Sequence, residues 1–166
     1  MGITIHPNGL VTGGKIRSSG SVIQVVSQAF DPYGDSGSGL RADSGTYTDS
    51  GMTLSITPTL STSKILVIST GTSFGYKTSS DNVNYLMRLI ATHASISTLQ
   101  LREIEVRKSG EGSSTSRLFD SWTMVSNHDH NTTQTITYKV QHKTATTTYA
   151  WARYKGGDMH LLEIAQ

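Results

Sequence analysis

Alternation of apolar and polar residues is the feature that most restricts how this chain can fold. In residues 52–57 (MTLSIT), Met, Leu and Ile alternate with Thr and Ser, which is the period-2 signature of a half-buried strand. Pro58 ends the segment because proline cannot donate to a strand ladder. Residues 64–70 (KILVIST) are more continuously apolar, as expected of a strand buried on both faces. We therefore expect a hairpin over residues 52–68.

Further segments with strand character follow along the chain. We expect them over residues 21–30, 84–92, 96–108, 117–127, 133–142, 147–154 and 159–165. Residues 84–92 could be helical by propensity, but their apolar residues alternate, which favours a strand. In residues 96–108 the apolar phase changes between Leu101 and Ile104, so we expect a β-bulge or a turn near Arg102-Glu103. Gly156-Gly157 is expected to turn the chain into the last strand.

These segments predict an all-β fold, a jelly-roll β-sandwich of about eight antiparallel strands with a short extended N-terminal arm. The arm takes residues 1–19, where only Ile3-Thr4-Ile5 has strand character, and the domain takes residues 20–166. Residues 31–51 and 109–116 are expected to be loops. With no cysteine in the chain, neither disulfides nor thiolate metal sites are expected. We also expect no signal peptide and no membrane span.

Composition argues against several functional classes. The net charge is only +2 and the basic residues are scattered, so we do not expect nucleic-acid binding. Serine, histidine and aspartate are all present, but Gly37-Ser38-Gly39 does not lead from a strand into a helix as a nucleophile elbow must. We therefore expect no enzyme and no cofactor.

Two polar clusters are candidate ion sites. His128 and His130 flank Asp129, and residues two apart on a strand share one face, so both imidazoles could bind one metal. The alternative is a polar turn between strands. The second cluster contains four aspartates in one glycine-rich region and could bind calcium through carboxylate oxygens; a solvated loop is the alternative. These aspartates are Asp31, Asp35, Asp43 and Asp49.

Apolar and aromatic residues supply candidate interfaces. Tyr149 and Trp151 alternate along one predicted strand and could stack on a sugar ring or pack in the core or between subunits. Ile3 and Ile5 of the arm could reach a neighbouring subunit.

Three segments resemble structural proteins of tailed phages. Residues 52–67 (MTLSITPTLSTSKILV) are similar to a pattern in which an Ile-Thr-Pro and Ser-rich turn leads to a Ser-Lys-Ile-Leu-Val strand. Residues 20–26 (GSVIQVV) resemble the first strand of those domains, and residues 161–166 (LLEIAQ) resemble their closing strand. The resemblance brackets residues 20–166.

The resemblance implies an eight-stranded jelly roll that forms trimers, as in capsid decoration (cement) proteins and tail-fibre head domains. It supplies no catalytic residues. We expect a decoration protein on the outer capsid surface, partnered by the major capsid protein, because the chain has no room for a fibre stalk. The alternative is a tail-fibre or receptor-binding subunit that recognises host glycans.

Overall fold

The protein is described by a computed structural model that covers residues 4–5, 11–12, 18–31, 41–42, 45–77, 83–108, 116–144 and 150–166. Within these residues all regular structure is strand, and eight strands have nine or more residues. The strands are β1 (Thr4–Ile5), β2 (Val11–Thr12), β3 (Val22–Phe30), β4 (Arg41–Ala42), β5 (Thr48–Ile56), β6 (Lys64–Lys77), β7 (Val83–His93), β8 (Ile96–Lys108), β9 (Ser116–Asp129), β10 (Ile136–Thr144) and β11 (Ala150–Ile164).

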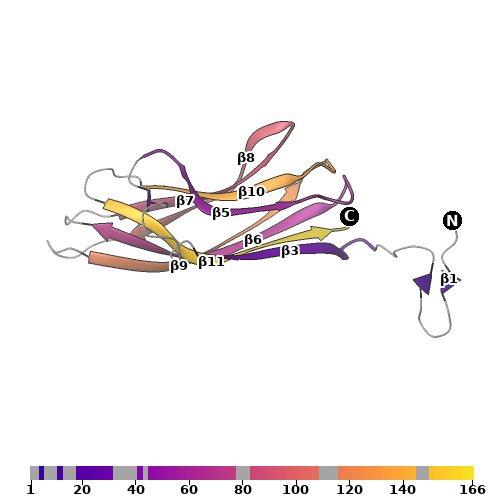
Figure 1. Ribbon diagram of the computed structural model, residues 1–166, viewed down its shortest axis with the longest axis horizontal. Coiled ribbons are helices and arrows are strands. Elements are labelled where there is room, and N and C mark those ends of the chain that lie inside the picture. Colours follow the sequence, from indigo (N-terminus) through magenta and orange to yellow (C-terminus); the bar gives the residue numbers. More distant parts are fainter. Residues whose placement is uncertain are drawn as a thin grey trace.

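The eight long strands form two packed antiparallel sheets (Figure 1), with the orders β3-β11-β6-β9 and β5-β10-β7-β8. Numbered one to eight along the chain, these orders are 1-8-3-6 and 2-7-4-5. The first strand pairs with the eighth, the second with the seventh, the third with the sixth and the fourth with the fifth. This nested pairing wraps the chain into a jelly roll. The predicted fold class is confirmed.

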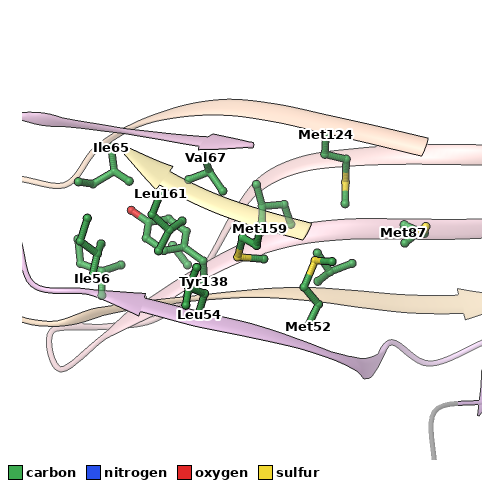
Figure 2. Close-up of a cluster of buried hydrophobic side chains, with 14 of the residues drawn as sticks. Met52, Leu54, Ile56, Ile65, Val67, Met87, Met124, Tyr138, Met159 and Leu161 are labelled. Carbon is green, nitrogen blue, oxygen red and sulfur yellow. The ribbon is translucent and has the colours of Figure 1, made fainter. Parts of the chain in front are cut away.

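The core lies between the sheets and follows the predicted alternation (Figure 2). Met52, Leu54 and Ile56 on β5 are buried, and Ile65 and Val67 face them from β6. The predicted alternation in β7 and β10 also holds, since the buried residues include Tyr85, Met87, Leu89 and Ala91 on β7 and Ile136, Tyr138 and Val140 on β10. Apolar area removed from water in this way drives the packing of the two sheets, at roughly 25 cal/mol per Å².

The predicted irregularity in residues 96–108 is a β-bulge. Leu89 of β7 pairs with Arg102, whereas the next residue, Ile90, pairs with Gln100, so Leu101 is the extra residue. The bulge restores the inward phase of the strand. Ile104 then packs against the core.

The expectation of a turn at Gly156-Gly157 is wrong. Both glycines lie within β11, which runs without interruption from Ala150 to Ile164, and the pairing with β6 shifts between Tyr154 and Gly156. Gly156 has a φ of 146°, and a Cβ at Gly157 would collide with the main-chain oxygen of Thr70. Here glycine permits a bulge and a close approach of two strands rather than a turn.

The predicted hairpin over residues 52–68 is also wrong. β5 and β6 belong to different sheets, and residues 57–63 cross between them. The expected loop over residues 31–51 includes β4 and the first four residues of β5. Local alternation indicates which face of a strand is buried, but the strand's partners depend on the whole chain.

The segment predicted as an arm contains β1 and β2, which pair antiparallel with each other. They form a two-stranded sheet of their own, separate from the two sheets of the sandwich. In Figure 1, β1 lies beyond the end of the sandwich. Among the described residues there is no helix long and apolar enough to span a membrane.

Candidate assembly surface

The outer face of the β5-β10-β7-β8 sheet is covered by hydrogen bonds within the chain. Ser55 Oγ and Thr137 Oγ1 lie 2.9 Å apart across β5 and β10. On the same two strands Lys139 Nζ donates to Asp49 Oδ2 at 2.8 Å. Burial opposes ionisation of Asp49, but hydrogen bonds from Lys139 and Gln141 outweigh it and lower its pKa. These polar groups of the face are therefore bonded to one another.

Tyr47 makes further contacts within the chain on the same outer face. Its hydroxyl donates to Glu103 Oε2 at 2.6 Å, and the Arg88 guanidinium and the Lys143 ammonium lie 4.0 and 4.4 Å from its ring centre. Cations over an aromatic face are attracted by the ring quadrupole. Burial and the Glu103 carboxylate raise the pKa of the Tyr47 hydroxyl. The ring thus joins β7, β8 and β10 on their outer side.

The outer face of the β3-β11-β6-β9 sheet is apolar at its centre. Val25, Leu162 and Leu66 lie in register on neighbouring strands, and Ile68 pairs with Val125 in an adjacent row. Their outward direction follows from period 2, because the residues between them on β6 and β11 are buried in the core. This set of five residues is called the apolar face below.

The apolar face is incompletely covered. Val25 is 56% exposed and Val125 is 48% exposed, whereas Leu66, Ile68 and Leu162 are half-buried. Single exposed apolar residues are ordinary, but a contiguous group on one sheet face is typical of an interaction surface. The two outer faces of the sandwich therefore differ. One carries polar side chains that bond to one another, and the other carries partly exposed apolar side chains.

Polar residues border the apolar face and carry balanced charge. Lys64 Nζ and Asp129 Oδ1 form an ion pair at 3.3 Å, and His160 Nδ1 lies 2.9 Å from Ser27 Oγ. A polar rim around an apolar centre is the usual composition of protein interfaces.

The candidate metal residues His128 and His130 are both buried, and their ring centres lie 6.1 Å apart. His128 is on β9, so the expected turn begins later than residue 128, although the two residues do share one side of the chain. His128 Nδ1 lies 2.8 Å from the Tyr138 hydroxyl, and His130 Nε2 lies 3.2 Å from Ser63 Oγ. Both rings are thus hydrogen-bonded within the chain.

Burial lowers the pKa of both imidazoles, that of His128 to about 4 with a further contribution from His130. The main-chain N–H of Thr132 donates to His130 Nδ1 at 3.3 Å, which suits a neutral ring. No group of three or more His, Cys, Asp or Glu is placed to hold a metal ion among the residues that the structure describes.

Sequence reasoning missed Glu163, a fully buried carboxylate on β11. It accepts hydrogen bonds from the main-chain N–H groups of Thr59 and Leu60, from the Ser63 hydroxyl at 2.7 Å, and from Gln24 at 2.7 Å. These donors outweigh burial and lower its pKa to about 2. The signal was present, because Glu163 shares the inward phase of Leu161. It ties the β5–β6 crossover to the last strand.

The proposed calcium region is only partly described. Asp49 is on β5 and is held by Lys139, and Asp31 directly follows β3. Asp35 and Asp43 lie outside the described residues.

The candidate interface residues stay predictions. Tyr149 and Ile3 lie outside the described residues, and for Ile5 on β1 and Trp151 on β11 only the main chain is described.

Comparison with known proteins gives limited similarity. No protein-family model and no curated protein sequence matches the chain. Among solved structures, a chain of the T13 IBDV viral particle is similar with a TM-score of 0.40 at 13% identity, over 98% of this chain and 35% of that one. A chain of infectious bursal disease virus Gt strain has a TM-score of 0.34 at 10% identity, over 89% of this chain and 37% of that one. The protein thus spans little more than a third of those chains, and similarity at this level carries no information on function.

Proposed function

We propose that this protein is a structural component of a virus particle, namely a capsid decoration protein that trimerises on the head surface and stabilises the shell. The observation that carries the proposal is the difference between the two outer faces of the jelly roll. One face uses its polar groups internally, and the other presents a partly exposed apolar centre inside a polar rim. The resemblance of residues 52–67 to tailed-phage structural proteins supports the same class.

A decoration protein acts through binding free energy and needs no chemical step. A component that binds the assembled shell and not its separated parts stabilises the shell by mass action. Many copies, each with a modest contact energy, add their effects through multivalency. The partners under this proposal are the major capsid protein and two further copies of the chain, with residues 1–19 serving attachment.

The test is a deletion virus, assayed in parallel for heat inactivation and for adsorption to its host. We expect particles that assemble and adsorb normally but rupture at lower temperature. Normal heat resistance with lost adsorption would overturn the decoration function and indicate the receptor-binding alternative.

Two point variants refine this test by changing the charge on one outer face or the other. Val125→Lys, on the apolar face, should abolish binding to particles that lack the protein. Glu105→Lys alters charge more strongly on an exposed residue of β8 and should leave binding intact. Equal binding by both variants would remove the apolar face from the proposal.

Removal of residues 1–19 should leave the melting temperature nearly unchanged, since β1 and β2 form a sheet separate from the sandwich, and should abolish binding to heads. An unfolded domain after this deletion would contradict the assignment of these residues as an attachment arm.

A further inference from the structure

The β3 strand is an uncharged sheet edge. It pairs with β11 on one side and stands at the end of the sheet order. Its sequence, VIQVVSQAF, contains no charged residue, no proline and no glycine over nine residues. An edge of this kind presents a row of main-chain N–H and C=O groups, with apolar side chains, as a template for another strand.

The other three edges carry the devices that normally prevent such pairing. β8 contains Arg102, Glu103 and Glu105, and its pairing with β7 is interrupted at two places. The β5 edge carries Asp49 and an irregular register with β10. The β9 edge carries Asp120 and Asp129. Charges and bulges on an edge are natural protection against strand addition. Among the four described edges β3 alone lacks charge, and its one irregularity is confined to Ile23 near its start.

We propose that β3 pairs antiparallel with β3 of a second copy of this chain, about a two-fold axis at Ser27. The pairing with β11 shifts between residues 22 and 24, which makes Ile23 the extra residue. The regular part of the strand is therefore residues 24–30, and its midpoint is Ser27. An axis at Ser27 pairs the longest regular segment, and it keeps inward residues opposite inward residues and outward residues opposite outward ones.

The composition of β3 favours a second copy as its occupant. A two-fold interface uses the same surface on both partners. A charge at Ser27 would therefore face the same charge, and a charge elsewhere on the strand would need an opposite charge at the symmetry-related position. β3 carries no charge, so neither constraint arises. About Ser27, the large Val25 lies opposite the small Ala29 of the partner, and Val26 lies opposite Gln28.

Strand pairing at this edge also extends the apolar face. Val25 is 56% exposed on the edge strand, next to Leu162 and Leu66 in register. In the pair, the apolar faces of two copies lie in one eight-stranded sheet, β9-β6-β11-β3-β3-β11-β6-β9. If the proposed function holds, this two-fold contact joins neighbouring trimers on the shell to one another, because adjacent three-fold positions of a closed shell are related by two-fold axes.

The absence of native cysteine allows a direct test by crosslinking. In the variant Ser27→Cys, each chain carries one thiol, and paired strands bring the two Cβ atoms within disulfide distance on the two-fold axis. The matched control is Val125→Cys, which lies in the same row of the sheet on the opposite edge strand. Both variants are oxidised mildly at equal protein concentration and examined on a denaturing gel.

We expect Ser27→Cys to form covalent dimers roughly tenfold faster than Val125→Cys, because the paired strands give the thiols a high effective concentration. Both variants can give only dimers, because each chain carries one thiol, so the rate of dimer formation is the quantity that distinguishes them. Equal rates for the two variants, or faster reaction at Val125, would overturn the proposal.

A second pair of variants covers the possibility that Ser27→Cys folds poorly. Val25→Lys adds a charge to the edge and should raise the dissociation constant of the pair at least about tenfold in sedimentation experiments, whereas Thr123→Lys on β9 should leave it unchanged. An unchanged dissociation constant for Val25→Lys would overturn edge pairing. The heat-inactivation assay is independent of these results, so either proposal can fail alone.

Discussion

Replacing Glu163 by glutamine should strongly destabilise the protein, although the change only replaces one carboxylate oxygen with an amide nitrogen. The carboxylate is fully buried, and its hydrogen-bond partners are all donors: Thr59, Leu60, Ser63 and Gln24. Glutamine keeps the shape of the side chain but presents an NH₂ group where an acceptor oxygen stood. At least one donor then faces another donor, and a buried donor without an acceptor is costly.

The magnitude follows from the pKa of this carboxyl group. A folded-state pKa of about 2, against an ordinary value of 4.5, means that folding favours the ionised form by about 3 kcal/mol. Glutamine resembles the protonated acid, so Glu163→Gln should lose about this amount at pH 7. For a chain of this length, the loss corresponds to a melting temperature roughly 6–12 °C lower.

Urea unfolding at pH 7 measures this loss, with Glu105→Gln on the exposed side of β8 as the matched control. The control should stay within about 0.5 kcal/mol of the unchanged protein. The carboxylate's contribution is present above pH 4.5 and is lost as the pH falls towards 2. The difference between Glu163→Gln and the unchanged protein should therefore shrink in acid. A cost for Glu163→Gln no larger than that of the control would refute the reasoning.

Three further predictions concern the interior. Burial lowers the pKa of His128 and His142 to about 4, below the ordinary 6.5. As the pH falls, the unfolded chain therefore binds protons before the folded one, and the free energy of unfolding should fall by about 3 kcal/mol per histidine between pH 6.5 and pH 4. Urea midpoints that do not change over this range would contradict this prediction. Ile65→Ala should cost roughly 2–5 kcal/mol in the same assay, because Ile65 is fully buried and its truncation leaves a cavity; a cost below that range would mean that the core collapses around it. Gly157→Ala should cost at least ~2 kcal/mol, because the added methyl group collides with β6. Gly45→Ala should be nearly neutral, because a methyl group there meets nothing within 4 Å. Comparable melting temperatures for the two variants would contradict the close approach of β11 and β6.

Local alternation predicted the burial of single strands well, because the direction of a side chain depends only on its parity along the strand. It identified the inward residues of β5, β7 and β10, and it predicted a bulge or a turn near Arg102-Glu103, next to the bulge that the structure has at Leu101. It failed on the connection over residues 57–63. A short polar segment of the same sequence can join two strands of one hairpin or two strands in different sheets. Only the pairing of the first strand with the eighth and of the second with the seventh decides between these, and such pairings are long-range.

Turn-like composition misled the prediction at two places. Gly156-Gly157 permits a bulge inside a long strand, and the polar residues near His128 continue β9 because that imidazole finds Tyr138 in the interior. The apolar face was only partly visible in the sequence. The expectation that residues 64–70 are buried on both faces holds for one face only, because Leu66 and Ile68 are half-buried on the outer face. Their neighbours Val25 and Val125 come from strands distant in sequence.

The last strand shows why stability and association can be altered separately in this fold. Along β11, Leu161 and Glu163 point into the sandwich, whereas His160 and Leu162 lie on the outer face. Period 2 assigns the two sets to different environments, so a substitution at Leu162 removes area from the apolar face while leaving the Glu163 hydrogen bonds intact. Variants of the outward set should therefore change association at nearly constant melting temperature, and variants of the inward set should lower the melting temperature whether or not the chains associate.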